Sequence, residues 1–243
     1  MRRGVVASLM LGLLLAACGG GSERTVLVFA AASLTDAFAD LETAFEAEHP
    51  DLDVQLNLAG SSALREQILE GAPADVFAAA DERIMAEVVA AELTAAAPEV
   101  FAVNALALVV PAGNPGSVTG LDAVADESLL VGVCAPAVPC GRFAAELFDR
   151  AGITPRPDTT EPDVRALLTK VAEDELDVGV VYVTDAVAAG RDVERIDIAA
   201  DVNVEARYPI AALTDSEGAA DFVAFVQSDE GRAILADHGF GLP

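Results

Sequence analysis

The chain has 243 residues, enough for one large domain or two smaller lobes, and with 53% hydrophobic residues it can bury a sizeable core. Its formal net charge is −26, from 40 acidic and 14 basic residues. Binding to nucleic acid and binding of a polybasic segment to anionic lipid both depend on clustered Lys and Arg. The excess of acidic residues therefore argues against both functions. Two histidines and three cysteines make histidine-rich metal sites and zinc ribbons unfavourable interpretations.

The N-terminus has the pattern of an export signal. Arg2 and Arg3 form a positive region, and residues 5–15 form an apolar run. That run is shorter than the about 20 residues that a membrane-spanning helix needs, but it fits the apolar part of a signal peptide. We therefore predict a signal peptide over residues 1–17.

A cysteine follows the signal. Ala16 and Ala17 lead into Cys18, which resembles the bacterial lipobox, in which the cysteine is lipidated and becomes the mature N-terminus. Residues 18–24 then form a lipidated cysteine and a flexible, glycine-rich tether. We expect a soluble body held at the outer, extracytoplasmic face of the cell membrane by lipid alone. The alternative is an ordinary signal peptide with a chance cysteine.

The first half of the body alternates strand and helix patterns. Residues 26–30 form an uninterrupted apolar run, typical of a strand buried on both faces. Ser33, with Asp36 three residues later, resembles a capping box at the start of a helix that ends at His49-Pro50. Further strands are predicted at residues 52–58 and 75–79, a helix that begins at Ser61 and ends before Gly71, and another from Asp81 to Ala91.

The second half repeats the alternation after a long apolar run at residues 104–111. The remaining elements are strands at 129–133, 178–183 and 208–213 and helices at 141–150, 163–172, 184–189, 217–227 and 229–237. Alternating strands and helices predict mostly parallel sheets covered by helices, an α/β fold. The long strand near residue 105 and a return near residue 206 favour two lobes with a ligand cleft between them. A single doubly wound sheet has the same order of elements.

The cysteines Cys134 and Cys140 form an even pair in a chain exported to an oxidising compartment. A disulfide between them would close a small loop and stabilise the fold by roughly 2 kcal/mol. Two free thiols and a metal pair are the alternatives, although no histidine lies nearby in the sequence. We predict the disulfide.

Hydrogen-bond donors follow several predicted strands, where the next helix begins. Ser33 follows the first strand, Ser61 and Ser62 follow the second, and Tyr182 ends a later one. Helix N-termini carry unpaired N–H groups and partial positive charge, so a pocket built from them attracts an anion without lysine or arginine. Taken singly, the serines are more often helix caps and the tyrosine a core residue.

Catalytic signatures are missing from the sequence. It has no G-x-S-x-G elbow, no H-E-x-x-H motif and no G-x-x-x-x-G-K phosphate loop. We therefore predict no catalytic residues and a chain that is not an enzyme.

Seven short motifs, in order, resemble the periplasmic molybdate-binding proteins of ABC transporters. The match runs from about Val26 to the end of the chain. The motifs are Val28–Thr35, Ala59–Ser62, Gly71–Phe77, Val138–Gly141, Asp163–Arg165, Gly179–Ala186 and Tyr208-Pro209, followed by Gly239-Phe240.

The resemblance implies a two-lobed periplasmic binding protein-like fold of type II, each lobe a mostly parallel sheet flanked by helices. Lobe I would hold residues 25–104 and 207–243, and lobe II residues 105–206. The implied oxyanion ligands are the hydroxyls of Ser33, Ser61 and Tyr182 and the amides of Ser33, Ser61, Cys140 and Val164, with Ser62 as a substitute for Ser61.

The resemblance also implies the function. The protein would capture molybdate or tungstate and deliver it, as a monomer, to the permease and ATPase of an ABC importer. No cofactor and no free metal cation is implied, because the molybdenum arrives as its oxyanion. The alternatives are a receptor for another tetrahedral oxyanion, such as sulfate, and an extracytoplasmic enzyme on the same fold.

A pocket of donors suits such a dianion on chemical grounds. Molybdate and tungstate carry no proton near neutral pH, whereas hydrogen phosphate has a proton that needs an acceptor. Asp163 would weaken this discrimination if its carboxylate pointed into the pocket. Sulfate is also free of protons, so its rejection would depend on cavity size.

Overall fold

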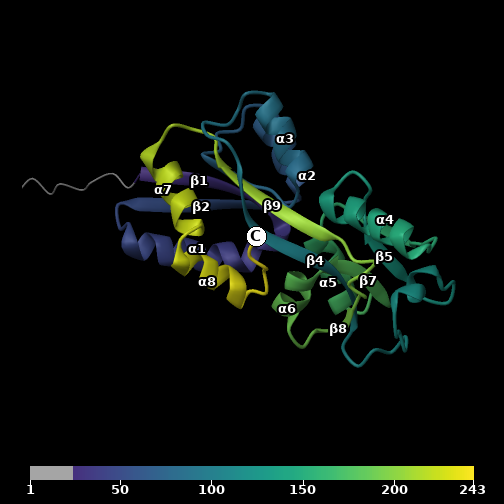
Figure 1. The fold of residues 1–243 in the computed structure, drawn as a ribbon. Coiled ribbons are helices and arrows are strands. Elements are labelled where there is room, and N and C mark those ends of the chain that lie inside the picture. Colours follow the sequence, from purple (N-terminus) through teal and green to yellow (C-terminus); the bar gives the residue numbers. More distant parts are fainter. Residues whose placement is uncertain (1–23) are drawn as a thin grey trace, which may run out of the picture.

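A computed structural model describes residues 24–243 as two α/β lobes joined by two long strands (Figure 1). The predicted signal peptide and Cys18 lie outside the described residues. None of the helices in residues 24–243 has the length and apolar character that a membrane-spanning helix needs.

The first lobe is built on three parallel strands. β1 (Arg24–Ala31) lies between β2 (Leu52–Ala59) and β3 (Val76–Ala78) and is parallel to both. A short 3₁₀ helix (Ala32–Leu34) follows β1. The α-helices of this lobe are α1 (Thr35–Glu48), α2 (Ser61–Leu69), α3 (Glu82–Ala90), α7 (Glu217–Val226) and α8 (Asp229–Asp237).

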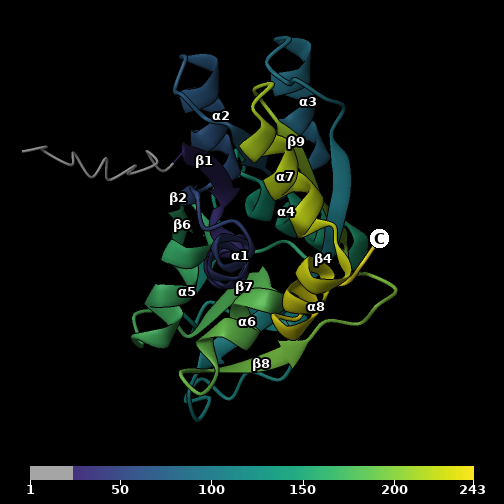
Figure 2. The same ribbon diagram turned by 90° about the vertical axis from the view of Figure 1, so that its left-hand side faces the viewer.

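Helix α1 covers one face of this sheet because its apolar residues recur at helical spacing. Phe38, Leu41 and Phe45 are fully buried, and the rings of Phe38 and Phe45 pack edge-on against Phe222 of α7. The 3₁₀ helix and α2 begin at the carboxyl ends of β1 and β2, on the side of the second lobe. Figure 2 shows α1 nearly end-on, with α8 beside it.

The second lobe has the same arrangement. β5 (Val131–Cys134) pairs in parallel with β6 (Thr159–Glu161) and with β7 (Val178–Tyr182). Its other elements are a 3₁₀ helix (Leu121–Ala125), α4 (Pro139–Ala151), α5 (Val164–Ala172), α6 (Val183–Ala189) and β8 (Val193–Asp197).

Two antiparallel strands, β4 (Glu99–Pro111) and β9 (Glu205–Ala212), run between the lobes (Figure 1). Residues 99–105 of β4 pair with β9, whereas residues 106–111 pair with β7 and β8. The strand order is therefore β2-β1-β3-β9-β4-β7-β5-β6, with β8 beside β4. This change of partner lies next to the predicted lobe limits at 104/105 and 206/207, which remain a prediction.

The predicted elements are found, but some of their bounds differ and further elements were not predicted. β4 begins at Glu99 rather than 104, and α4 begins at Pro139 rather than 141, because proline is compatible with the first helical position. Two strands were not predicted: β6, which has three residues, and β8, whose exposed charged side chains do not resemble a buried strand. The 3₁₀ helix at Leu121–Ala125 was not predicted either.

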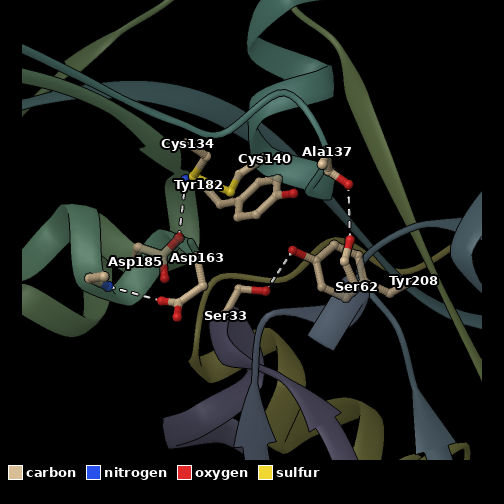
Figure 3. The surroundings of a disulfide bond; sticks show 10 residues. Ser33, Ser62, Cys134, Ala137, Cys140, Asp163, Tyr182, Asp185 and Tyr208 are labelled. Atoms are coloured by element: carbon tan, nitrogen blue, oxygen red, sulfur yellow. Dashed lines mark hydrogen bonds between the residues drawn. A yellow bond between two sulfur atoms is a disulfide. The ribbon is translucent and has the colours of Figure 1, made fainter. Parts of the chain in front are cut away.

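Cys134 and Cys140 form the predicted disulfide, with their Cα atoms 5.7 Å apart (Figure 3). It joins the end of β5 to the first turn of α4. We expect reduction to lower the free energy of unfolding by roughly 2 kcal/mol, measured by urea titration with and without reductant. Alkylation of these two cysteines before reduction, read by mass spectrometry, would contradict the bond.

Candidate functional site

All five residues predicted to bind an oxyanion line one cavity, where the two lobes meet. The cavity volume is about 20 Å³. Ser33 and Ser61 come from the first lobe, and Cys140, Val164 and Tyr182 from the second. The remaining lining residues are Ala31, Ala32, Gly60, Ala80, Val138, Pro139 and Asp163.

Helices that begin at the cavity are capped differently from helices that begin elsewhere. The residues that precede the 3₁₀ helix, α2 and α4 are Ala31, Gly60 and Val138, and none of the three caps its helix with a side chain. By contrast, Asp81, Ser216 and Ser228 cap α3, α7 and α8 with side-chain oxygens. The first N–H groups of a helix have no partner within it, so these three starts leave donors facing the cavity.

Asp163 is the partial exception, because it lies at the cavity and also caps α5. Its Oδ1 accepts a hydrogen bond from the N–H of Ala166 at 2.9 Å. One carboxylate oxygen is therefore engaged within its own helix, and the N–H of Val164 is left at the helix start.

The Ser61 hydroxyl is buried and its orientation is constrained. Its Oγ accepts a hydrogen bond from the N–H of Ala80 at 3.0 Å. Because that bond occupies a lone pair of the oxygen, the hydroxyl proton is free to be donated to the cavity. Ser61 is the first residue of α2 rather than its cap, so the simple capping role does not apply. Ser62 instead donates to the carbonyl oxygen of Ala137 in the other lobe at 3.0 Å.

The Ser33 hydroxyl is also buried, 2.9 Å from the hydroxyl of Tyr208 (Figure 3). The predicted capping box with Asp36 is wrong: α1 is preceded by Leu34 and has no side-chain cap. Asp36 instead pairs with Arg165 of the second lobe. Tyr208 belongs to one of the sequence motifs, but its contact with Ser33 joins residues 175 positions apart and was not predicted.

Tyr182 supplies a third hydroxyl from the end of β7. Its Oη is buried and has no hydrogen-bond partner within residues 24–243. Burial raises the pKa of the phenol well above its usual value, so it stays protonated and can donate. Figure 3 places this ring beside the disulfide, opposite Ser33 and Tyr208.

Two arginines of the second lobe pair with carboxylates of the first lobe, outside the cavity lining. Arg142 of α4 pairs with Asp81, and Arg165 of α5 pairs with Asp36. The Nε of Arg165 also donates to the carbonyl oxygen of Ala32 at 3.3 Å. Among the described residues, the cavity lining includes no lysine or arginine. The positive groups thus hold the lobes together, while neutral donors face the cavity.

Asp185 lies fully buried behind the cavity and is predicted to make stability depend on pH. Burial raises its pKa to about 7, while Arg165 and the N–H of Tyr182 oppose the rise. Because the folded pKa exceeds the unfolded value, stability is lost as pH rises toward 7. From about pH 6 to about pH 8 the loss should be roughly 1 kcal/mol. Asp185→Asn should remove that loss in urea titrations, and an unchanged pH dependence would contradict the assignment.

Comparisons with known proteins agree with this arrangement. Residues 26–241 match the profile of a family described as bacterial extracellular solute-binding proteins. A molybdate-binding protein (ModA) of Mycobacterium tuberculosis is 38% identical, over 98% of this chain and 96% of that protein. The molybdate-binding protein ModA of Escherichia coli is 32% identical, over 90% and 89%.

Solved structures confirm the two-lobed α/β fold. The periplasmic molybdate-binding protein of Azotobacter vinelandii superposes with a TM-score of 0.78 at 18% identity, covering 90% of this chain and 99% of that one. The sulfate-binding protein SubI of Mycobacterium tuberculosis gives 0.81 at 17% identity, covering 90% and 87%. From the profile match and the identities of the curated relatives, the chain belongs to the family of bacterial extracellular solute-binding proteins.

Proposed function

We propose that the protein captures molybdate or tungstate outside the cytoplasm and delivers it to the permease and ATPase of an ABC importer. The observation that carries this proposal is the composition of the cavity. Three buried hydroxyls and the first N–H groups of four helices converge on a space lined by no cationic side chain among the described residues. The names of the curated relatives support the choice of anion.

The proposed ligands are the hydroxyls of Ser33, Ser61 and Tyr182 and the amides of Ser33, Ser61, Cys140 and Val164. A hydrogen bond to a charged group contributes about 1.5–3 kcal/mol. Several such bonds, after the entropic cost of binding, support an affinity of about 1 μM or better. Ser62 is not a proposed ligand, because its hydroxyl is engaged by Ala137.

Binding from both lobes would couple capture to closure. Ser33 and Ser61 are held by one lobe and Cys140, Val164 and Tyr182 by the other. An anion that contacts both sets stabilises the closed arrangement, which an importer can recognise. We propose that the protein acts in this way as a monomer, without a cofactor and without a catalytic step.

Titration calorimetry with four oxyanions tests the proposal. Molybdate and tungstate should bind, whereas sulfate and hydrogen phosphate should not at the same concentrations. Sulfate binding as tight as molybdate binding would instead favour a sulfate receptor. Failure of all four anions to bind would reject the oxyanion site altogether.

The lipid anchor at Cys18 is part of the proposal. Cys18→Ser should shift the exported protein from the membrane fraction to the soluble fraction, because the lipid chains are the expected attachment. Fractionation followed by immunoblotting measures this shift. A Cys18→Ser protein that stays with the membrane would contradict lipidation at this residue.

A further inference from the structure

A buried row of polar side chains lies behind Ser33, outside the cavity lining. It comprises Asn104 on β4, Tyr208 on β9 and Thr184 on α6, all 6% exposed or less. Both linking strands therefore contribute to it. Buried polar groups are costly unless they are hydrogen-bonded, so their bonding pattern is constrained.

The orientation of the Asn104 amide is set by its own strand. Its Oδ1 accepts a hydrogen bond from the N–H of Ala105 at 2.9 Å, so Nδ2 must face the other way. Nδ2 lies 2.8 Å from Oγ1 of Thr184 and 3.4 Å from Oη of Tyr208. An amide nitrogen is a donor only, so both hydroxyl oxygens accept from it.

This orientation determines the direction of the next bond. Tyr208 Oη receives a hydrogen from Asn104, so its own proton goes to Ser33 Oγ, 2.9 Å away. If Ser33 instead donated to Tyr208, the Tyr208 oxygen would accept from both Ser33 and Asn104. The Tyr208 proton would then have no partner in the row. Burial keeps the Tyr208 proton in place, because it raises the pKa of the phenol.

Ser33 then has one of its two lone pairs engaged by Tyr208, and its own proton is left for the cavity. The Ser61 hydroxyl is held in the same way, because its oxygen accepts a hydrogen bond from the N–H of Ala80 and its proton is left for the cavity. We propose that Asn104 and Tyr208 are positioning residues that present Ser33 to the cavity as a donor and so favour oxyanions that carry no proton. This inference rests on the proposed function, because it assigns the anion class of the same site.

Tyr208→Phe tests the last bond of the row. The aromatic packing of the ring against Phe101, Tyr182 and Phe240 is retained, so the variant should fold. Ser33 would no longer receive a hydrogen and could accept one from the ligand. Molybdate affinity should fall about fivefold. The ratio of the molybdate affinity to the hydrogen phosphate affinity should fall by more than about fivefold.

Asn104→Asp tests the direction of the row. A carboxylate oxygen in place of Nδ2 accepts from Tyr208, which would then accept from Ser33 and turn the Ser33 oxygen toward the cavity. The preference for molybdate over hydrogen phosphate should fall at least about tenfold. Both ligands are dianions, so repulsion by the new charge would weaken both equally and leave their ratio unchanged.

Thr184→Val is the matched control. It removes one hydrogen bond of Asn104 from the same buried row but no step between Asn104 and Ser33. Its anion preference should stay within about twofold of the parent protein. Thermal unfolding of each variant shows that it is folded before titration.

Calorimetry with molybdate and hydrogen phosphate then gives distinct outcomes. The measured quantity is the ratio of molybdate affinity to hydrogen phosphate affinity. A lower ratio in Tyr208→Phe and Asn104→Asp, with an unchanged ratio in Thr184→Val, supports the positioning role of Asn104 and Tyr208. If the parent protein binds molybdate and both variants keep its ratio, the row is rejected while the proposed function stands. If the parent protein binds none of the oxyanions, the proposed function fails, and this inference with it.

Discussion

Ser61→Ala should weaken molybdate binding about a hundredfold, corresponding to roughly 3 kcal/mol. Two losses combine in this variant. The anion loses a hydroxyl donor, and the buried N–H of Ala80 loses its acceptor at 3.0 Å. The second loss also disturbs the start of the loop that leads from β3 into α3. Titration calorimetry measures the affinity, and urea titration separates the effect on stability.

Ser62→Ala is the matched control for this experiment. Ser62 is the next residue of the same helix turn, but its hydroxyl donates to Ala137, and neither residue lines the cavity. Its removal should change affinity only about threefold, through a weaker contact between the lobes. Equal losses in the two variants would show that Ser61 does not donate to the anion.

Gly141→Ala should lower the free energy of unfolding by about 3 kcal/mol and strongly weaken anion binding. A Cβ at this position would overlap the carbonyl oxygen of Ala135 and lie 2.6 Å from that of Cys134. These are backbone atoms, and the disulfide closes the same turn, so the conflict cannot be relieved by a rotated side chain. The turn would have to shift, and the Cys140 amide would move with it.

Gly120→Ala provides the comparison. Gly120 has an extended backbone, with φ of 179°, and an added Cβ would meet nothing within 4 Å. It should therefore leave stability and affinity unchanged. Urea titration and calorimetry on both variants test the claim. A Gly141→Ala protein as stable as the parent would mean that the turn beside Cys140 is more adaptable than its contacts indicate.

Local sequence patterns were sufficient to predict most of the fold. The apolar run before Ser33 and the helical spacing from Phe38 to Phe45 identified β1 and α1, because burial of those residues dictates both patterns. β8 was missed because an edge strand can keep charged side chains in solvent, which removes the apolar signal. The strand was predicted to begin at Asn104, although the apolar residues 100–103 also belong to β4, with a register shift between Val100 and Ala102.

The residues that line the cavity could be predicted from the sequence, but the residues that contact them from behind could not. Ser33, Ser61 and Tyr182 follow strands, so the topology of parallel sheets brings them to one edge. Tyr208 contacts Ser33, and Asn104 contacts Tyr208. Both contacts depend on the pairing of β9 with β4, which joins distant parts of the sequence. The pairing of Arg142 with Asp81 likewise joins two lobes, and no local pattern encodes such a contact.

The C-terminal residues take part in the link between the lobes. The N–H of Val103 donates to the carbonyl oxygen of Gly241 at 2.8 Å, and the N–H of Gly241 returns a bond to Val103 at 2.9 Å. Phe240 packs its ring edge-on against Tyr208. A purification tag fused after Pro243 would therefore start two residues from this link and risk altering the measured affinities. An immobilisation handle is better placed ahead of β1, where the native tether would attach.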